Sequence, residues 1–277
     1  ELPGFPFKAE AVWSPRDAVR LPEIPEKLVI LGAGVIGLEM ATIYRRLGAE
    51  IEVLEMADSL LPEMNLDKRF SSLLSRELKG SGVNLHTKTK ATELKEDSDG
   101  RLVIAEKDGK TTEFEADIVL SAVGRKPNST SVMDGLDLEK YNGGYIKIDR
   151  KCRTSEKGIY AIGDVAGPPL LAHKASKQGL IAAAEIANKN TDQYKVVPSA
   201  VFTDPEYAEV GLSVQEARKD GYEPTSGRFP FRASGKALAM GEERGMVQLV
   251  ADKDSDKLLG GAILGPHASD LIGEIAL

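Results

Sequence analysis

Three glycines are spaced as Gly-x-Gly-x-x-Gly, at Gly32, Gly34 and Gly37, and an acid, Glu55, follows 18 residues after the last of them. In this spacing the first glycine permits a sharp turn, the second lets a pyrophosphate approach the backbone, and the third lets a helix pack closely on a strand. The acid can accept hydrogen bonds from both hydroxyls of an adenosine ribose and would repel a 2′-phosphate. The pattern therefore predicts a site for NAD. The alternative is an ordinary strand–helix–strand unit without a ligand, because the glycine motif also occurs by chance.

The sequence also predicts the two strands and the helix that would position these residues. Residues 27–31 are typical of a short buried strand, a helical pattern follows from Leu38 to Leu47, and residues 50–55 predict the next strand. This order places the free N–H groups of the helix N-terminus beside the glycine turn, where a phosphate would lie at the positive end of the helix dipole. The context favours the NAD site over a chance match.

Downstream segments predict a doubly wound sheet that carries a small inserted meander. The run 117–124 is nearly continuous in apolar residues and predicts another buried strand. Gly124 and Arg125 follow at its carboxyl end, the edge at which such sheets bind ligands, although the same residues also fit a loop that leaves the domain. The other predicted elements are a helix over 66–78, a strand over 83–87 and meander runs near 91–95, 101–106 and 111–116.

A second candidate ligand site begins at Gly163 and Asp164. The apolar residues 159–162 predict a short strand, so Asp164 would stand at its carboxyl end and could accept a hydrogen bond from a sugar or sugar-alcohol hydroxyl. The helix predicted over 172–187 would offer its N-terminal N–H groups to an electron-rich ring oxygen. The alternative is that Asp164 caps a turn. The inner face of this helix is expected to carry Ala175, Leu180, Ile181, Ala184 and Ile186.

Composition excludes several classes of protein. The 277 residues, 42% of them hydrophobic and 29% charged, fit a soluble globular protein of one or two domains. A net charge of −7 argues against nucleic acid as a partner, and no apolar run is long enough to span a membrane. The single cysteine, Cys152, excludes an internal disulfide and a Cys-x-x-Cys metal site and fits a reducing compartment, so we expect no bound metal and a cytoplasmic location. Because Glu1 opens a loop-like segment and Leu277 interrupts a helical pattern, we expect a piece of a longer protein.

Several motifs occur in the order typical of one family. They are Gly-Ala-Gly-Val-Ile-Gly-Leu-Glu at 32–39, Val-Gly-Arg-Lys-Pro-Asn at 123–128, Ile-Tyr-Ala-Ile-Gly-Asp at 159–164 with Leu-Ala-His-Lys-Ala at 171–175, and further segments at 197–206 and 259–265. The chain resembles the FAD-dependent pyridine nucleotide–disulfide oxidoreductases, and among them the branch that oxidises dihydrolipoamide. The resemblance implies an α/β fold in which a Rossmann-like NAD domain is inserted in an FAD domain and followed by a partial α+β dimerisation domain. The implied parts are 1–22, the end of the first FAD-domain segment; 23–126, the NAD-binding domain; 127–195, the second FAD-domain segment; and 196–277, the partial dimerisation domain.

The resemblance also assigns residues to two cofactors. Glu39 would lie near the contact between nicotinamide and flavin, although an exposed helix glutamate is the alternative, because helix surfaces favour Glu. Thr89 would lie near the adenine, and His173 would contribute backbone and packing rather than act as a general base. The implied NAD residues are Gly32, Ala33, Gly34, Val35, Ile36, Gly37, Glu39, Glu55, Thr89, Gly124 and Arg125, and the implied FAD residues are Gly163, Asp164, Leu171, Ala172 and His173.

The implied reaction passes electrons from dihydrolipoamide through a disulfide and FAD to NAD. A homodimer is implied, with the lipoyl domain of a 2-oxoacid dehydrogenase or glycine cleavage complex as partner. This sequence lacks the family's Cys-x-x-x-x-Cys pair, its first FAD glycine loop and its C-terminal His–Glu pair, and Cys152 matches neither cysteine. We therefore expect no catalytic residue in this chain and no activity from it alone. The alternatives are a relative of mercuric reductase or soluble transhydrogenase, with Glu55 arguing against the users of NADP, and a redox-silent NAD-binding module.

Overall fold

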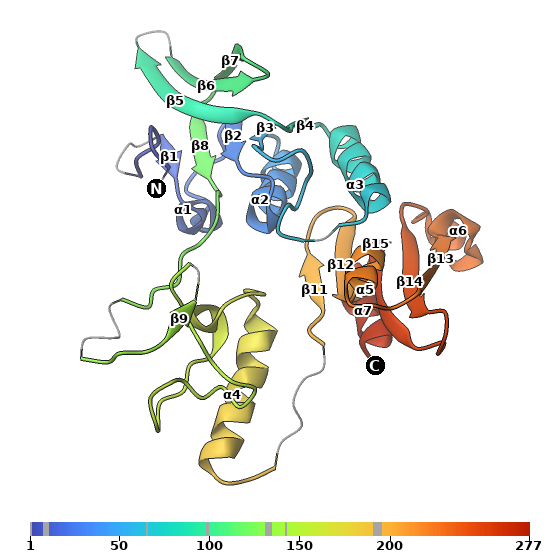
Figure 1. Ribbon diagram of the computed structural model, residues 1–277. Coiled ribbons are helices and arrows are strands. Elements are labelled where there is room, and N and C mark those ends of the chain that lie inside the picture. Colours follow the sequence, from blue (N-terminus) through green and yellow to red (C-terminus); the bar gives the residue numbers. More distant parts are fainter. Residues whose placement is uncertain are drawn as a thin grey trace. The chain divides into compact units, whose positions relative to one another are not determined.

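A computed structural model describes residues 2–7, 11–64, 66–97, 100–130, 135–141, 143–190 and 196–277. The chain forms two compact units, one of residues 1–124 with 200–277 and the other of residues 125–199 (Figure 1). Within the described ranges, no helix combines the length and the apolar content needed to cross a bilayer.

The first unit contains a parallel sheet with the strand order β1-β8-β2-β3-β4. Side chains alternate along β2, so that Leu28 and Ile30 join a core with the helices, whereas Val29 and Leu31 join a core with the inserted meander. Helices therefore cover one face of the sheet and the meander covers the other. The elements are β1 (Val12–Trp13), α1 (Pro15–Arg20), β2 (Lys27–Leu31), α2 (Val35–Arg46), β3 (Glu50–Leu54), α3 (Lys68–Gly80), β4 (Val83–His86) and β8 (Ile118–Ser121).

The inserted meander predicted from the sequence is an antiparallel sheet. It has the order β5-β6-β7, and Asp108 and Gly109 connect its last two strands with φ values of 50° and 75°. Positive φ at both central residues is the conformation that a two-residue hairpin turn needs, and Asp-Gly adopts it readily. The strands are β5 (Lys90–Asp97), β6 (Gly100–Lys107) and β7 (Lys110–Glu115).

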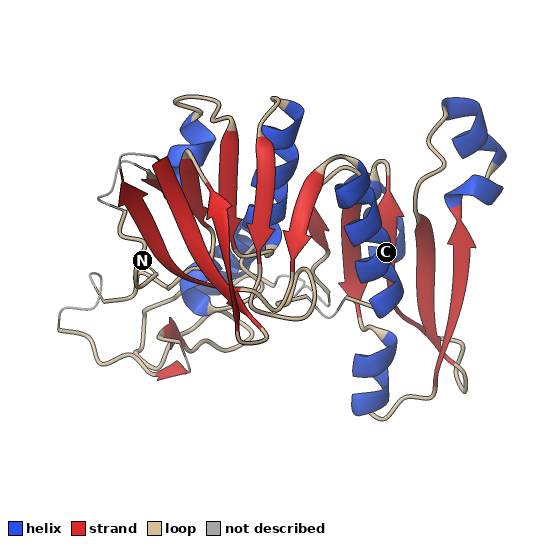
Figure 2. Ribbon diagram, turned by 90° about the horizontal axis from the view of Figure 1, so that it is seen from above, coloured by secondary structure: helices blue, strands red, loops and turns tan. Residues whose placement is uncertain are grey.

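The C-terminal part of the first unit is an antiparallel sheet with helices, which confirms the α+β prediction. Its strand order is β11-β12-β15-β14-β13, and Figure 2 shows its strands in red beside those of the parallel sheet. A capping box begins α5, in which Ser213 and Glu216 accept from each other's backbone N–H groups. The elements are β11 (Ser199–Val201), β12 (Glu206–Gly211), α5 (Val214–Lys219), β13 (Pro224–Pro230), α6 (Gly235–Met240), β14 (Met246–Asp252), β15 (Leu258–Gly265) and α7 (Ala268–Ala276).

The second unit differs from the prediction in its strands. Residues 159–162, expected to form a strand, are not assigned to one. Among the described residues, this segment forms one isolated antiparallel bridge, between Arg153 and Tyr160. Backbone hydrogen bonds pair this segment with residues 152–154, from the Ala161 N–H to the Cys152 carbonyl at 3.1 Å and from the Thr154 N–H to the Ile159 carbonyl at 3.0 Å. The pairing stays short because the chain turns at residues 149–152 on one side and enters η1 at Gly163 on the other. The unit's elements are β9 (Lys140–Tyr141), β10 (Tyr145–Ile146), the 3₁₀ helix η1 (Gly163–Ala166) and α4 (Ala172–Ile186).

The inner face of α4 is also not the one predicted. Leu180 and Ile186 are 65% and 63% exposed in this structure, whereas the polar residues Lys174 and Gln178 are buried. Ile181 is buried, as predicted. The polar pair takes the inner position because its side chains bond the backbone of residues 163–167.

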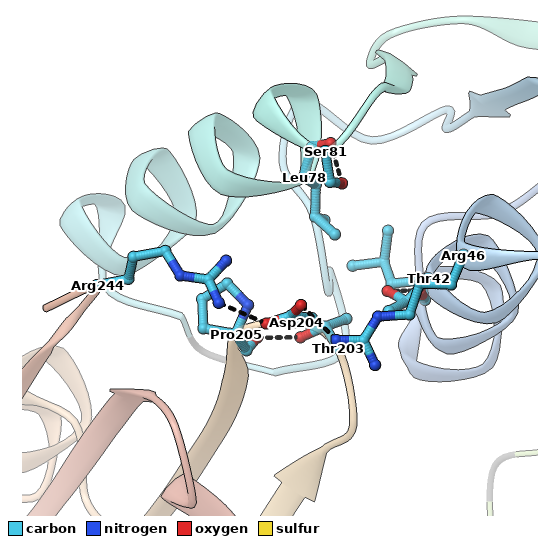
Figure 3. A network of polar contacts seen from close by, with 9 residues as sticks. Thr42, Arg46, Leu78, Ser81, Thr203, Asp204, Pro205 and Arg244 are labelled. Atoms are coloured by element: carbon cyan, nitrogen blue, oxygen red, sulfur yellow. Dashed lines mark hydrogen bonds and ion pairs between the residues drawn. The ribbon is translucent and has the colours of Figure 1, made fainter. Parts of the chain in front are cut away.

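A polar network joins α2 to the antiparallel sheet of the first unit (Figure 3). Asp204, in the loop between β11 and β12, accepts hydrogen bonds from Arg46 of α2 and, at 2.9 Å, from Arg244. Partial burial raises the pKa of Asp204, but the hydrogen bonds and charges of the two arginines outweigh it and hold the pKa below its ordinary value. Thr203 closes the same loop by donating to the Pro205 carbonyl at 2.7 Å. The helix that follows the glycine turn is thereby tied to the antiparallel sheet.

We predict that Asp204→Asn lowers the free energy of unfolding by no more than about 1 kcal/mol at neutral pH, because these charges are partly exposed. Because the pKa of Asp204 is lower in the folded state, its carboxylate stabilises the fold at pH values above the unfolded pKa of about 3.9. This stabilisation is lost as the pH falls through the pKa of the folded state. The difference between wild type and variant should therefore shrink between about pH 5 and pH 3. Urea unfolding across this range measures it, with the exposed Asp58→Asn as the control. A difference that stays constant with pH would contradict the prediction.

Candidate functional site

The three motif glycines have different environments. Gly32 has φ +100°, and a Cβ on it would lie 2.7 Å from the Ala122 carbonyl oxygen. A Cβ on Gly37 would lie 2.0 Å from the Gly32 carbonyl oxygen, closer than any side chain permits. A Cβ on Gly34, in contrast, would meet nothing within 4 Å. The fold itself thus requires Gly32 and Gly37, whereas Gly34 leaves open space at the surface of the turn, as a bound pyrophosphate would need.

The N-terminus of α2 lies directly at this open space. Gly34 is the N-cap residue and has no side chain to accept from the N–H groups of the first turn. The helix begins at Val35, three residues before the predicted start, so Val35 and Ile36 present first-turn N–H groups, and both are partly exposed. These groups, together with the helix dipole, form an environment suited to an anion.

Glu55 fixes the glycine turn from the end of the neighbouring strand. One carboxylate oxygen accepts from the Ala33 N–H and the other from the Ala57 N–H, each at 2.7 Å. The side chain is 9% exposed, so these bonds compensate for burying a carboxylate. Thr89, 3% exposed, donates its N–H to the Glu55 carbonyl at 2.8 Å. The residues expected at the adenosine half are therefore connected by hydrogen bonds, and each carboxylate oxygen keeps further acceptor capacity for a ligand.

Glu39 lies one turn further along α2 and is half-buried rather than an exposed helix glutamate. Its carboxylate accepts from the Phe202 N–H at 3.0 Å, which connects α2 to β11 and the loop that follows it. Burial raises the pKa of Glu39, and the hydrogen bond from Phe202 opposes this rise. A carboxyl group in this setting takes up a proton more readily than an exposed one.

The residues expected at the flavin lie in the second unit. The Asp164 carboxylate lies 3.9 Å from the Arg125 guanidinium, and both line a pocket of about 260 Å³ together with Lys126 and Tyr145. The backbone carbonyl of Asp164, rather than its carboxylate, closes the turn by accepting from the Gly167 N–H at 3.1 Å. The carboxylate therefore remains directed to the pocket.

The remaining expected flavin residues surround the start of α4. Leu171 is its N-cap, and Ala172 and His173 form its first turn and are exposed. His173 bonds the Pro198 carbonyl at 2.7 Å through Nε2. Gly124, with φ +119°, ends the first of the two segments that make up the first unit, and Arg125 is the first residue of the second unit.

Sequence reasoning missed three residues that hold these sites: Phe202, Lys174 and Gln178. The signal for the last two was present, because they are polar residues four positions apart on one face of a predicted helix. For Phe202 no signal existed, since it contributes a backbone N–H.

A glycine turn between a parallel strand and a helix, with an acid at the end of the next strand, defines a dinucleotide-binding α/β protein. A family model described as pyridine nucleotide-disulphide oxidoreductase matches residues 1–179, and one described as the dimerisation domain of the same family matches residues 197–277. The chain belongs to the pyridine nucleotide-disulphide oxidoreductase family. The family resemblance and the fold class predicted from the sequence are confirmed.

Similar proteins support the same assignment. The chain is 42% identical over 280 residues to the dihydrolipoyl dehydrogenase of Halobacterium salinarum and 44% identical over 284 residues to that of Thermus scotoductus. These matches cover all of this chain but 59% and 60% of the two relatives. The crystal structure of LpdA from Mycobacterium tuberculosis superimposes with a TM-score of 0.88 at 28% identity, covering all of this chain and 60% of that one. The chain thus spans about three-fifths of the length of the relatives it matches.

We predict that alanine affects NADH binding at Gly34 and stability at Gly37. Gly34→Ala should change the free energy of unfolding by less than about 1 kcal/mol, because its φ of −73° suits alanine and the space is open, but should weaken NADH binding at least about tenfold by occupying the phosphate approach. Gly37→Ala should destabilise the fold by roughly 3 kcal/mol, because its Cβ overlaps the Gly32 carbonyl. Chemical unfolding and NADH fluorescence titration measure the two effects. Unchanged NADH affinity in Gly34→Ala would show that no phosphate approaches there.

Proposed function

We propose that the chain supplies the cofactor-binding and dimerisation parts of a dihydrolipoyl dehydrogenase, which passes electrons from dihydrolipoamide through a disulfide and FAD to NAD. The observation that carries the NAD part is the carboxylate of Glu55, which is held beside the open glycine turn by the Ala33 N–H at 2.7 Å. The named relatives, dihydrolipoyl dehydrogenases that match over the whole chain, support the choice of substrate.

In the proposed NAD site, the pyrophosphate lies over Gly34 and the first turn of α2, and Glu55 accepts from the ribose hydroxyls. Thr89 lies on the adenine side and Glu39 on the nicotinamide side. This assignment follows the family resemblance, and it is supported by the hydrogen bond from Thr89 to Glu55 and by the half-buried position of the Glu39 carboxylate beside Phe202. The other members of the proposed site are Gly32, Ala33, Val35, Ile36, Gly37, Gly124 and Arg125.

The proposed FAD site is the part of the second unit around Asp164. A pocket of about 260 Å³ lined by the Asp164 carboxylate suits the polar chain of a flavin cofactor, whose hydroxyls could donate to Asp164. When bound, the flavin supplies the transfer of electrons between nicotinamide and thiols, and the protein supplies binding and orientation. The other members are Gly163, Leu171, Ala172 and His173.

We propose the same four parts for the chain as the family layout implies, with 1–22 and 127–195 belonging to the FAD domain, 23–126 to the NAD domain and 196–277 to the dimerisation domain. Support comes from the compact unit 125–199 and from the family model that starts at residue 197. The dimerisation-domain match supports a homodimer. A lipoyl domain as partner and a cytoplasmic location complete the proposal.

One observation favours a second candidate, an NAD-binding module without redox activity of its own. The single cysteine, Cys152, is 2% exposed, and its thiol donates to the Gln178 carbonyl at 3.7 Å. Burial raises the pKa of Cys152, which disfavours the reactive thiolate. A disulfide cycle needs two accessible thiols, so this cysteine cannot supply it.

We predict that Glu55 sets the preference for NADH over NADPH. Glu55→Gln should weaken NADH binding by about tenfold or more and narrow the gap to NADPH, because it removes a charged acceptor and its repulsion of a 2′-phosphate. Titration of both cofactors by fluorescence measures the ratio, with Glu50→Gln, an exposed residue of the same strand, as the matched control. An unchanged ratio would remove Glu55 from the ribose site.

A further prediction concerns the redox activity of the 277-residue chain on its own. The 277-residue chain should show no oxidation of dihydrolipoamide by NAD above the buffer rate, at concentrations where it binds NADH, because it has one buried cysteine. Absorbance of NADH at saturating dihydrolipoamide measures this. Turnover by the purified chain would mean that electrons reach NAD without a protein disulfide.

A further inference from the structure

Lys174 is a buried cation at an unfavourable place. It lies in the first turn of α4, is 3% exposed, and donates to the carbonyls of Gly163, at 3.4 Å, and Gly167. The first turn of a helix carries positive partial charge, so a cation there is repelled, and removing an ammonium from water costs further free energy. Burial lowers the pKa of Lys174, while the negative charge of Asp164 opposes this change. The contacts of the Lys174 ammonium must therefore offset both the repulsion by the helix N-terminus and the cost of burial.

The two carbonyls that Lys174 bonds flank the turn that carries Asp164. Gly163 is the first residue of η1 and has a φ of 74°, and Gly167 directly follows η1 and has a φ of 101°. Gln178, one helical turn after Lys174, accepts from the Gly163 N–H at 2.8 Å. Two side chains of α4 therefore hold the turn. Gln178 bonds the N–H of Gly163, and Lys174 bonds the carbonyls of Gly163 and Gly167.

The opposite side of the turn is held as well. Tyr141 of β9 donates its hydroxyl to the Ala166 carbonyl at 2.9 Å. A Cβ on Gly167 would lie 1.5 Å from the Tyr141 hydroxyl oxygen, and one on Gly163 would lie 3.1 Å from the Ala175 Cβ. The backbone of the turn is thus enclosed between α4 and β9, and the side chain of Asp164 lines the pocket beside it.

We propose that Lys174 is a positioning residue, whose ammonium fixes the turn 163–167 so that the Asp164 carboxylate stays directed to the pocket it shares with Arg125. An apolar side chain at this position would leave two buried carbonyls without this donor, and of the described bonds between the turn and α4 only the one from the Gly163 N–H to Gln178 would remain. The role toward the ligand rests on the proposed FAD site. The role in holding the turn stands on the hydrogen bonds alone.

The decisive experiment is amide hydrogen exchange on the full 277-residue chain without any cofactor. Lys174→Met keeps the aliphatic stem and removes the ammonium, and Lys177→Met on the same helix is the matched control. We expect exchange in residues 163–167 to accelerate at least about tenfold in Lys174→Met, with peptides from β2 unchanged and Lys177→Met like wild type. Unchanged exchange in the turn would overturn the proposal. If Lys174→Met fails to fold, Lys174→Gln, which is shorter and uncharged but still a donor, is compared in the same way.

A second measurement tests the link to the flavin. FAD is titrated into each chain by quenching of its fluorescence, and Lys174→Met should bind at least about tenfold more weakly than wild type, with partial recovery in Lys174→Arg. Equal affinity in wild type and Lys174→Met would overturn the positioning role. A wild-type chain that binds no FAD would count against the proposed FAD site, whereas the exchange experiment would still decide whether Lys174 holds the turn.

Discussion

The contact between α2 and β2 at Gly37 is the constraint on which the rest of the first unit depends. With 2.0 Å between a hypothetical Gly37 Cβ and the Gly32 carbonyl oxygen, the helix can start where it does only because this residue has no side chain. That start directs the N-terminus of α2 to the open space at Gly34. It also places Glu39 where its carboxylate reaches the Phe202 N–H, and Arg46 where it reaches Asp204. One close backbone approach therefore sets both the candidate ligand site and the attachment of the antiparallel sheet.

The parts of this arrangement that could be predicted from the sequence are those with a repeating or local signal. The apolar run in 27–31 and the glycine spacing each predict a local conformation, and the structure confirms the strand and the turn. Glu55 was found in the same way, because its position after a strand and its charge are both visible in the sequence. Its second role, holding the Ala33 and Ala57 N–H groups, is not visible there, since those partners are backbone.

The errors have a common physical cause. The inner face of α4 was assigned by apolar side chains, but Lys174 and Gln178 occupy it because buried backbone groups of a distant turn need their hydrogen bonds. Likewise, the segment 159–162 is apolar enough for a strand, yet its partner segment is short, because the Cys152 N–H bonds the Asp149 carbonyl in a turn. Hydrophobic patterns report burial of apolar surface and carry no information on which backbone donors and acceptors remain to be satisfied.

The buried charges of both candidate sites share one principle: their partners are mostly backbone dipoles rather than opposite charges. Glu55 is held by two N–H groups, Glu39 by one, and Lys174 by two carbonyls. A salt bridge would neutralise such a group, whereas a peptide dipole orients it and leaves its net charge in place. The field of the charge then still acts on whatever binds beside it. Fixed charges that are oriented but not neutralised are what a protein needs to align a polar cofactor, so the same bonds that stabilise these turns also keep them able to recognise a ligand.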